Sequence, residues 1–318
     1  MASLATSGLS LPKHLASGLW SKVQTTSTLA RLSGQTPMLF GTTQFMTFTT
    51  KPKGEVVAEA ANKSQSQPAF STVDAIPRKV QVTQRFNQEV QWADEAYQLG
   101  VLTAMRDAGS EALSRALDLI AYHAINPLTG AALSGSPTKV LDSANTVEVT
   151  SRNADEDIDA AVGLILNDGF YGVNGIAFDP AYAYALATIR DDDSGRKRYP
   201  ELGTGQGMSG FNGLNAAVST TVSAPEAAIS GGAYNSVNPN VKAIVGDFQN
   251  GIKWGVQEEI PVEVIRFGDP DGQGDLKRAN QIALRLEVVY GLAIFDTSAF
   301  AVIKDATASS SSSSSSSS

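Results

Sequence analysis

The 318-residue sequence contains no cysteine. Disulfide bonds, thiolate metal sites and cysteine nucleophiles are therefore excluded, and cysteine usage does not indicate whether the protein resides in an oxidising or a reducing compartment. Only two histidines occur, and no apolar run approaches the roughly 20 residues that a membrane-spanning helix needs. Hydrophobic residues nevertheless make up 42% and charged residues 18%, which is typical of a folded protein with a sizeable core.

Acidic residues are also missing from residues 1–54, which carry five basic residues. Since the whole chain has a net charge of −8 and this segment has +5, the remaining residues carry −13. A basic segment on an acidic body is suited to nucleic acid or to the acidic surface of a second copy. We predict an N-terminal arm over residues 1–36 that gains its burial on another chain. A frayed terminus and a transit peptide are the alternatives.

Residues 37–86 are predicted to form a long two-stranded hairpin. Aromatic and polar residues alternate in its first part, and Val80 and Val82 alternate with polar residues further along. We expect β-rich flanks at Glu55–Glu59 and Val73–Phe86, joined by the polar tip NKSQSQP. Because an isolated hairpin is only marginally stable in water, we expect neighbouring chains to support this one.

A long amphipathic helix is predicted over Asp94–Ile125, within a segment spanning residues 87–150. Apolar residues recur at helical spacing from Leu102 onward, with charged residues on the opposite side. Pro127 ends the run, because proline cannot continue a helix. At about 1.5 Å per residue the helix is roughly 45 Å long, which is more than a small globule can bury on its own.

A compact α/β lobe is predicted over residues 151–255. A helix capped by Asn153 and led by acidic residues is followed by a short buried strand, and a second helix begins at Pro180. NAAVSTTVSA predicts a further strand, and residues 225–240 a loop.

Residues 256–306 are rich in strand patterns. VKAIVGDF and GIKWGV precede them as two short strands, and VEVIRF and the long run NQIALRLEVVYGLAIF lie within them. Leu284 and Leu286 alternate with Arg285 and Glu287, so we expect this run to lie beside the long helix. Residues 307–318 are a low-complexity, Ser-rich tail that we expect to be disordered.

No set of residues indicates catalysis or a cofactor. His123, near the end of the long helix, is expected to be structural, and the sequence GTGQGMSG lacks the helix that a phosphate-binding loop requires after it. DPDGQGDLKRAN places Asp269, Asp271 and Asp275 at calcium-loop positions, but Asn280 stands where a bidentate Glu is needed. We expect a solvated turn with no metal there, and a metal site is the alternative.

The order of these parts resembles that of tailed-bacteriophage major capsid proteins of the Hong Kong 97-type fold, over about residues 37–304. The segments that carry the resemblance are VVAEAANKSQSQPAFSTVDAIPRKVQVTQRF, the long helix, GIAFDPAYAYALATIRDDDSGRKRY, MSGFNGLNAAVSTTVSA, VKAIVGDFQNGIKWGV and NQIALRLEVVYGLAIFDTSAFAVI. The resemblance implies an α+β fold. Its parts would be an N-terminal arm (1–36), an extended loop hairpin (37–86), a peripheral domain with a long spine helix and a long β-sheet (87–150 and 256–306), and an α/β axial domain (151–255).

The resemblance also implies a structural role without enzymatic activity. Such chains form hexamers and pentamers of an icosahedral shell around double-stranded DNA, which they enclose without sequence-specific binding. The implied partners are further copies of the chain, a portal, and separate scaffolding or decoration proteins, with no membrane. The implied location is the virion, after assembly in the host cytoplasm. An encapsulin-type compartment around a cargo enzyme is one alternative, and an α/β enzyme using the Asp269–Asp275 loop as a metal site is another.

We expect the arm and the extended loop to supply the contacts between subunits. The candidate contact residues are Lys13, Lys22, Arg31, Lys51, Lys53, Glu55, Glu59, Lys63 and Arg78. Family members often begin with a long scaffolding segment, for which this chain has no room, so we expect a separate scaffold or none. Some members cross-link a loop lysine to an asparagine of a neighbour. Lys51, Lys53, Lys63 and Asn280 are candidates for that reaction, but no motif secures the pairing and we expect none.

Overall fold

The computed structural model describes most of the chain. The described residues are 27–50, 53–66, 69–92, 95–135, 137–149, 153–167, 172–191, 193–224 and 241–306. The predicted loop at 225–240, the Ser-rich tail and most of the predicted arm lie outside these residues. The chain forms two compact units, of which the first comprises Ser33–Ser114 and Ile252–Phe295, and the second the described parts of 27–32, 115–251 and 296–306.

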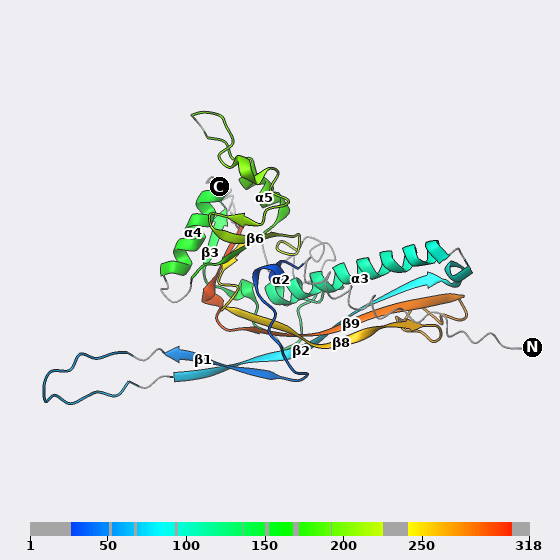
Figure 1. The fold of residues 1–318 in the computed structure, drawn as a ribbon, viewed down its shortest axis with the longest axis horizontal. Helices are drawn as coiled ribbons and strands as arrows, with labels where there is room; N and C mark the ends of the chain where they lie inside the picture. The colour runs from blue at the N-terminus through cyan, green and yellow to red at the C-terminus, as the bar shows by residue number, and fades with distance from the viewer. Residues whose placement is uncertain are drawn as a thin grey trace, which may run out of the picture. The chain divides into compact units, whose positions relative to one another are not determined.

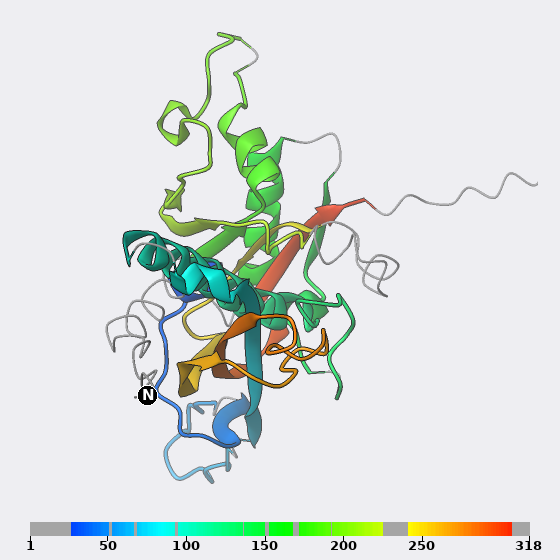
Figure 2. The same cartoon turned by 90° about the vertical axis from the view of Figure 1, so that its right-hand side faces the viewer.

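The first unit is built on a four-stranded antiparallel sheet. Its order is β1 (Thr43–Thr50), β2 (Ala69–Asn87), β9 (Gln281–Ile294) and β8 (Ile252–Ile265). The long strand β2 changes partner along its length, since it pairs with β1 as far as Ala75 and with β9 from there on. The hairpin made by β1 and the start of β2 therefore extends beyond β9, as Figure 1 shows, and Figure 2 shows it from another side.

Two strand predictions in this region need correction. Glu55–Glu59 is irregular rather than a strand. The strand that pairs with β2 in the hairpin is β1, and Val56, the apolar residue within Glu55–Glu59, is fully exposed. GIKWGV and VEVIRF form the single strand β8, which bulges around Gln257 and again after Ile260. The predicted long run NQIALRLEVVYGLAIF, in contrast, is confirmed as the single strand β9, and β10 (Phe300–Asp305) follows it as a strand of the other sheet.

The predicted long helix is confirmed as α3 (Glu95–His123). Its residues up to Ser114 belong to the first unit, and there it lies beside β9 as expected. A Cβ built on Gly109 would come within 3.0 Å of the Leu286 side chain. The Tyr290 hydroxyl donates to the Leu113 carbonyl at 3.3 Å. A short 3-10 helix, η1 (Gln88–Trp92), precedes α3.

The second unit holds a six-stranded mixed sheet. Its strand order is β3-β10-β7-β4-β6-β5, and the bounds not yet given are β3 (Thr146–Val149), β7 (Val241–Gly246), β4 (Gly175–Phe178), β6 (Leu214–Val218) and β5 (Gly210–Phe211). The helices of this unit include α2 (Thr28–Leu32), α4 (Ala154–Asn167) and α5 (Pro180–Ala187). Short 3-10 helices lie at η2 (Val140–Asp142), η3 (Pro200–Leu202) and η4 (Thr297–Ala299).

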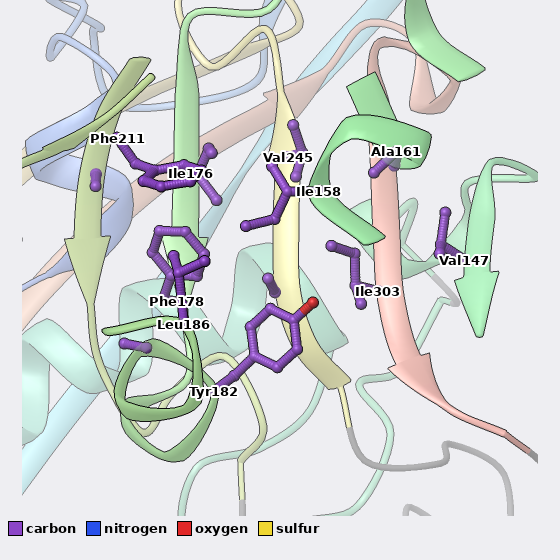
Figure 3. Packing of buried hydrophobic residues seen from close by; sticks show 14 of the residues in the cluster. Val147, Ile158, Ala161, Ile176, Phe178, Tyr182, Leu186, Phe211, Val245 and Ile303 are labelled. Atoms are coloured by element: carbon purple, nitrogen blue, oxygen red, sulfur yellow. The ribbon is translucent and has the colours of Figure 1, made fainter. Parts of the chain in front are cut away.

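The core of the second unit lies between the sheet and the helices α4 and α5. Figure 3 shows Phe178 of β4, Val245 of β7 and Ile303 of β10 directed toward apolar residues such as Ile158 of α4 and Leu186 of α5. All of these side chains are buried. The first unit has a separate small cluster around Met38, so each unit has apolar packing of its own.

The sequence located two helices of the second unit well, α4 and α5, but did not predict α2. Helix α4 begins at Ala154 with acidic residues in its first turn, where the amide groups favour negative charge. Helix α5 begins at Pro180, and the Asp179 carboxylate accepts from the Ala181 amide at 2.8 Å. The strand predicted after Asn215 is shorter than expected, since β6 ends at Val218 and turns follow.

Candidate functional site

The two faces of the β1–β2 hairpin differ in their packing. On one face, Phe45 and Val73 pack against Met38, Ala75 and Ala293. The ring of Phe45 also meets that of Phe295 edge-on, with 5.5 Å between their centroids. This alternation along β1 is what a half-buried strand requires.

The other face of the hairpin is open and presents apolar side chains among polar ones. Met46 of β1 and Ile76 of β2 are exposed there, and Val56 in the connecting loop is fully exposed. The loop itself is held by local hydrogen bonds. The Ser64 amide donates to the Glu55 carboxylate at 2.9 Å, the Ser64 hydroxyl also donates to it, and these bonds lower the pKa of Glu55. Exposed apolar side chains on a projecting element are typical of a protein–protein contact surface.

The structure brings some of the predicted contact residues together and leaves others apart. Lys53, Glu55, Glu59 and Lys63 all lie exposed in the loop 53–66. Arg78 is half-buried further along β2, and Arg31 is exposed on α2 in the other unit. The remaining candidates, Lys13, Lys22 and Lys51, lie outside the described residues. Contact of any of these nine residues with a second copy stays a prediction.

Residues 33–41 form a segment that the sequence did not reveal, and we call it the strap. It crosses the sheet of the first unit beside β8. The Trp254 indole donates to the Ser33 carbonyl at 3.1 Å, and the Thr36 amide donates to the Trp254 carbonyl at 2.8 Å. A Cβ on Gly255 would lie 2.1 Å from the Thr36 carbonyl oxygen, so the strap needs a glycine there. A glycine inside a strand pattern is the signal that indicates such a close backbone approach.

The expected arm is therefore corrected over its described part. Leu29 and Leu32 of α2 are buried in the second unit, and Met38 of the strap is buried in the first. Residues 27–38 thus find burial on their own chain. Their apolar residues are few, but Leu29, Leu32 and Met38 are each buried against residues distant in the sequence, which spacing along the sequence does not show.

The acidic loop after β8 is filled by an arginine. Arg85 of β2 donates from Nε to both carboxylate oxygens of Asp271, at 2.8 and 2.7 Å, and from Nη2 to Asp269 at 3.0 Å and to the Gly274 carbonyl at 2.9 Å. The bond from Arg85 lowers the pKa of Asp271. The solvated turn expected here is thus an ion-paired loop, and a guanidinium stands where the alternative placed a metal ion. The described residues contain no cluster of metal-ligating side chains.

Asn280 ends this loop in a left-handed conformation, with φ of 54°. The side-chain amide of Asn280 donates to the Glu89 carboxylate at 3.0 Å, and the backbone carbonyl of Asn280 accepts from the Gln88 backbone amide at 2.9 Å. The side chain that the cross-linking alternative requires is therefore hydrogen-bonded within its own chain.

Asp118 is the centre of a buried polar cluster in the second unit. It lies on α3 and accepts hydrogen bonds at the start of α2 from the Thr28 amide at 3.0 Å, the Thr28 hydroxyl at 2.7 Å, the Leu29 amide at 3.2 Å and the Ser27 hydroxyl. The Thr221 hydroxyl donates to it at 2.8 Å. Burial raises the pKa of Asp118, and these hydrogen bonds act in the opposite direction. The Asp118 carboxylate thus caps α2 and also holds the turn that follows β6. Figure 1 shows α2 beside the C-terminal end of α3, where Asp118 lies.

His123 lies one helical turn further along α3 and is buried. Its Nε2 donates to the Thr221 carbonyl at 3.0 Å. Burial lowers the pKa of His123 to about 4, and the charge of Lys139 acts in the same direction. The imidazole is therefore neutral at pH 7 and joins α3 to the same turn that Asp118 holds.

Acid is expected to destabilise the chain through His123. Because its pKa is about 6.5 when unfolded and about 4 when folded, its contribution is complete above pH 6.5 and is lost as the pH falls toward 4. Between pH 7.5 and 4.5 this loss amounts to about 2.5 kcal/mol. Urea unfolding at the two pH values, compared with His123→Gln, measures it. Equal pH dependence in the two proteins would contradict this assignment.

A projecting hairpin with exposed apolar side chains is typical of a subunit of a larger assembly. Comparisons with known proteins specify which assembly. The model of the phage capsid family matches residues 7–305, and no curated protein sequence matches the chain. The chain therefore belongs to the phage capsid family.

Solved structures agree with this assignment. One from Mycobacterium phage Ogopogo is 55% identical, covers 88% of this chain and 92% of its own, and superposes with a TM-score of 0.81. One from Gordonia phage Cozz is 29% identical, covers 89% and 87%, and has a TM-score of 0.73. The capsid of an empty GTA particle shares the fold at 15% identity, with coverage of 88% and 90% and a TM-score of 0.59.

The protein is thus a phage major capsid protein with an α+β fold, a structural protein that builds an icosahedral capsid from many copies. Nothing in the comparisons favours the encapsulin alternative. Among the described helices, none combines the length and apolarity of a membrane span.

Proposed function

We propose that the chain forms the hexamers and pentamers of this shell, and that the β1–β2 hairpin with its loop 53–66 lies across a neighbouring copy. The observation that carries the proposal is the exposure of large apolar side chains on the hairpin, Met46 and Ile76 on its open face and Val56 in its loop. Covering such side chains contributes about 25 cal/mol per Å² of apolar area. A closed symmetric assembly repeats this small gain at every subunit.

The loop adds charge to this apolar contact. Lys53 and Lys63 stand beside Glu55 and Glu59, so the exposed loop presents both signs within a short stretch. Mixed charge favours one docking geometry over others, because like charges repel in the wrong registers. The same reasoning extends to Arg78, Arg31 and the lysines of the N-terminal segment, which we propose as further contacts with neighbouring copies.

We propose corresponding roles for the rest of the chain. The long helix and the four-stranded sheet form the peripheral domain, and residues 151–255 form the axial domain near the capsomer centre. The shell encloses double-stranded DNA without sequence-specific binding, which the net charge of −8 supports because phosphate binding needs a strongly basic surface. The role is structural rather than catalytic. The partners are a portal and separate scaffolding or decoration proteins, and assembly takes place in the host cytoplasm before the protein resides in the virion.

Particles purified from infected host cells test this function. Electron microscopy is expected to show closed shells with six-fold and five-fold clusters, and nuclease treatment is expected to leave genome-length double-stranded DNA inside them. An enzyme cargo without DNA would support the encapsulin alternative instead. A solitary chain in analytical ultracentrifugation, with the hairpin packed on its own unit, would overturn the proposal.

A further inference from the structure

The strap presents two large apolar side chains to solvent immediately before the hairpin. Leu39 is 87% exposed and Phe40 is 69% exposed. We call this pair of residues the apolar patch, because large exposed apolar residues that occur together mark an interaction site more often than a scattered single residue does. β1 begins at Thr43, so the two residues directly precede the hairpin in the chain.

The residues directly before and after Leu39 and Phe40 are anchored to the sheet of the first unit. Met38, directly before them, is buried in the cluster with Ala75 and Ala293. Gly41, directly after them, exchanges two hydrogen bonds with the Gln257 side chain, whose amide donates to the Gly41 carbonyl at 2.8 Å and whose carbonyl accepts from the Gly41 amide at 3.4 Å. A segment fixed at both ends loses little conformational entropy on binding, so an apolar contact made there is not offset by ordering.

The chemistry of the strap narrows the kind of partner. Residues 33–50 contain no charged residue. Binding to DNA is electrostatic and requires lysine or arginine at the contact, so an uncharged apolar patch does not suit phosphate groups. A protein surface does suit it, because the centres of protein interfaces are depleted in charge and enriched in aromatic residues. In a shell built from many copies of one chain, the protein surface present at every subunit is that of another copy.

We propose that Leu39 and Phe40 dock onto a second copy of this chain and form an apolar contact point of the shell, with Gln257 as a positioning residue. This inference rests on the proposed function, since it assumes that the hairpin region faces a neighbour. The two residues supply the burial, and Gln257 maintains the strap conformation that presents them.

The test compares two matched double substitutions in the full chain. L39S/F40S removes the patch. L128S/F267S removes a leucine and a phenylalanine of similar exposure, 88% and 75%, elsewhere on the chain. Sedimentation is expected to show at least a tenfold smaller assembled fraction for L39S/F40S, with thermal unfolding of the unassembled chain unchanged. L128S/F267S is expected to assemble like the unsubstituted chain.

Two further variants keep the inference falsifiable if L39S/F40S folds poorly. L39M/F40L keeps the patch apolar and is expected to assemble normally. Q257A leaves both side chains in place and is expected to speed hydrogen exchange at Gly41 and to lower the assembled fraction severalfold. If L39S/F40S assembles like its control, or Q257A releases the strap without affecting assembly, the inference is overturned. Failure of the unsubstituted chain to form shells would instead overturn the proposed function.

Discussion

Replacing Asp118 with alanine is expected to lower the free energy of unfolding by about 3–4 kcal/mol. The carboxylate is buried and accepts from two backbone amides and three hydroxyl groups. Without it, the first amides of α2 lose their cap and remain shielded from water. An unsatisfied buried donor costs about 1–3 kcal/mol, so several of them account for the loss.

Thermal unfolding of the unassembled chain measures this effect, with a midpoint expected to fall by about 10 °C. Asp118→Asn separates shape from charge, because an amide of the same size keeps only part of the acceptor capacity. Its unfolding midpoint should lie between those of the unsubstituted chain and Asp118→Ala. Glu111→Ala is the matched control, an exposed acidic residue on the same helix, and should change stability by no more than about 0.5 kcal/mol. If Asp118→Ala unfolds like Glu111→Ala, α2 is not held by this carboxylate.

Replacing Gly255 with alanine is expected to displace the strap and to cost about 3 kcal/mol. The added Cβ would lie 2.1 Å from the Thr36 carbonyl oxygen, which is backbone and cannot rotate away. Gly291 pairs with Gly255 in the β8–β9 register, and a Cβ added to Gly291 would lie 2.7 Å from the sulfur of Met38. The hydrogen bond from the Thr36 amide to Trp254 should break, so hydrogen exchange at Thr36 should quicken along with the loss of stability.

Gly163→Ala is the control for this substitution, because the same chemical change is expected to raise stability there rather than lower it. Gly163 lies inside α4, and no heavy atom lies within 4 Å of the position that its Cβ would take. Alanine there should stabilise the chain by about 0.5–1 kcal/mol, because glycine is a poor helix former. If both substitutions changed stability alike, the close approach of the strap to β8 would be wrong.

Local periodic patterns predicted the main elements closely. The bounds of α3 fall within two residues of the predicted helix, because an amphipathic stripe and a terminating proline act over short range. Pro180 marked the start of α5 for the same reason. The alternation of Leu284 and Leu286 with Arg285 and Glu287 identified both the strand β9 and its buried face.

Strand ends and joins were predicted less well. Glu55–Glu59 carries a strand pattern but has no partner strand, whereas β1 has Ala69–Ala75 opposite it. The bulges of β8 fall where the pattern suggested two strands, since a bulge interrupts the alternation without ending the pairing. Pairing is decided by residues distant in sequence, which local patterns do not contain.

By itself, the sequence determined the helices α3, α4 and α5, the long strands and the order of parts that resembles a capsid protein. Only the tertiary structure showed that Arg85 fills the acidic loop around Asp271, that Asp118 caps α2, and that Gly255 makes room for the strap. The physical reason is range. Helix and strand signals come from neighbouring residues, but each of these contacts joins groups far apart along the chain, and their meeting depends on how the whole unit packs.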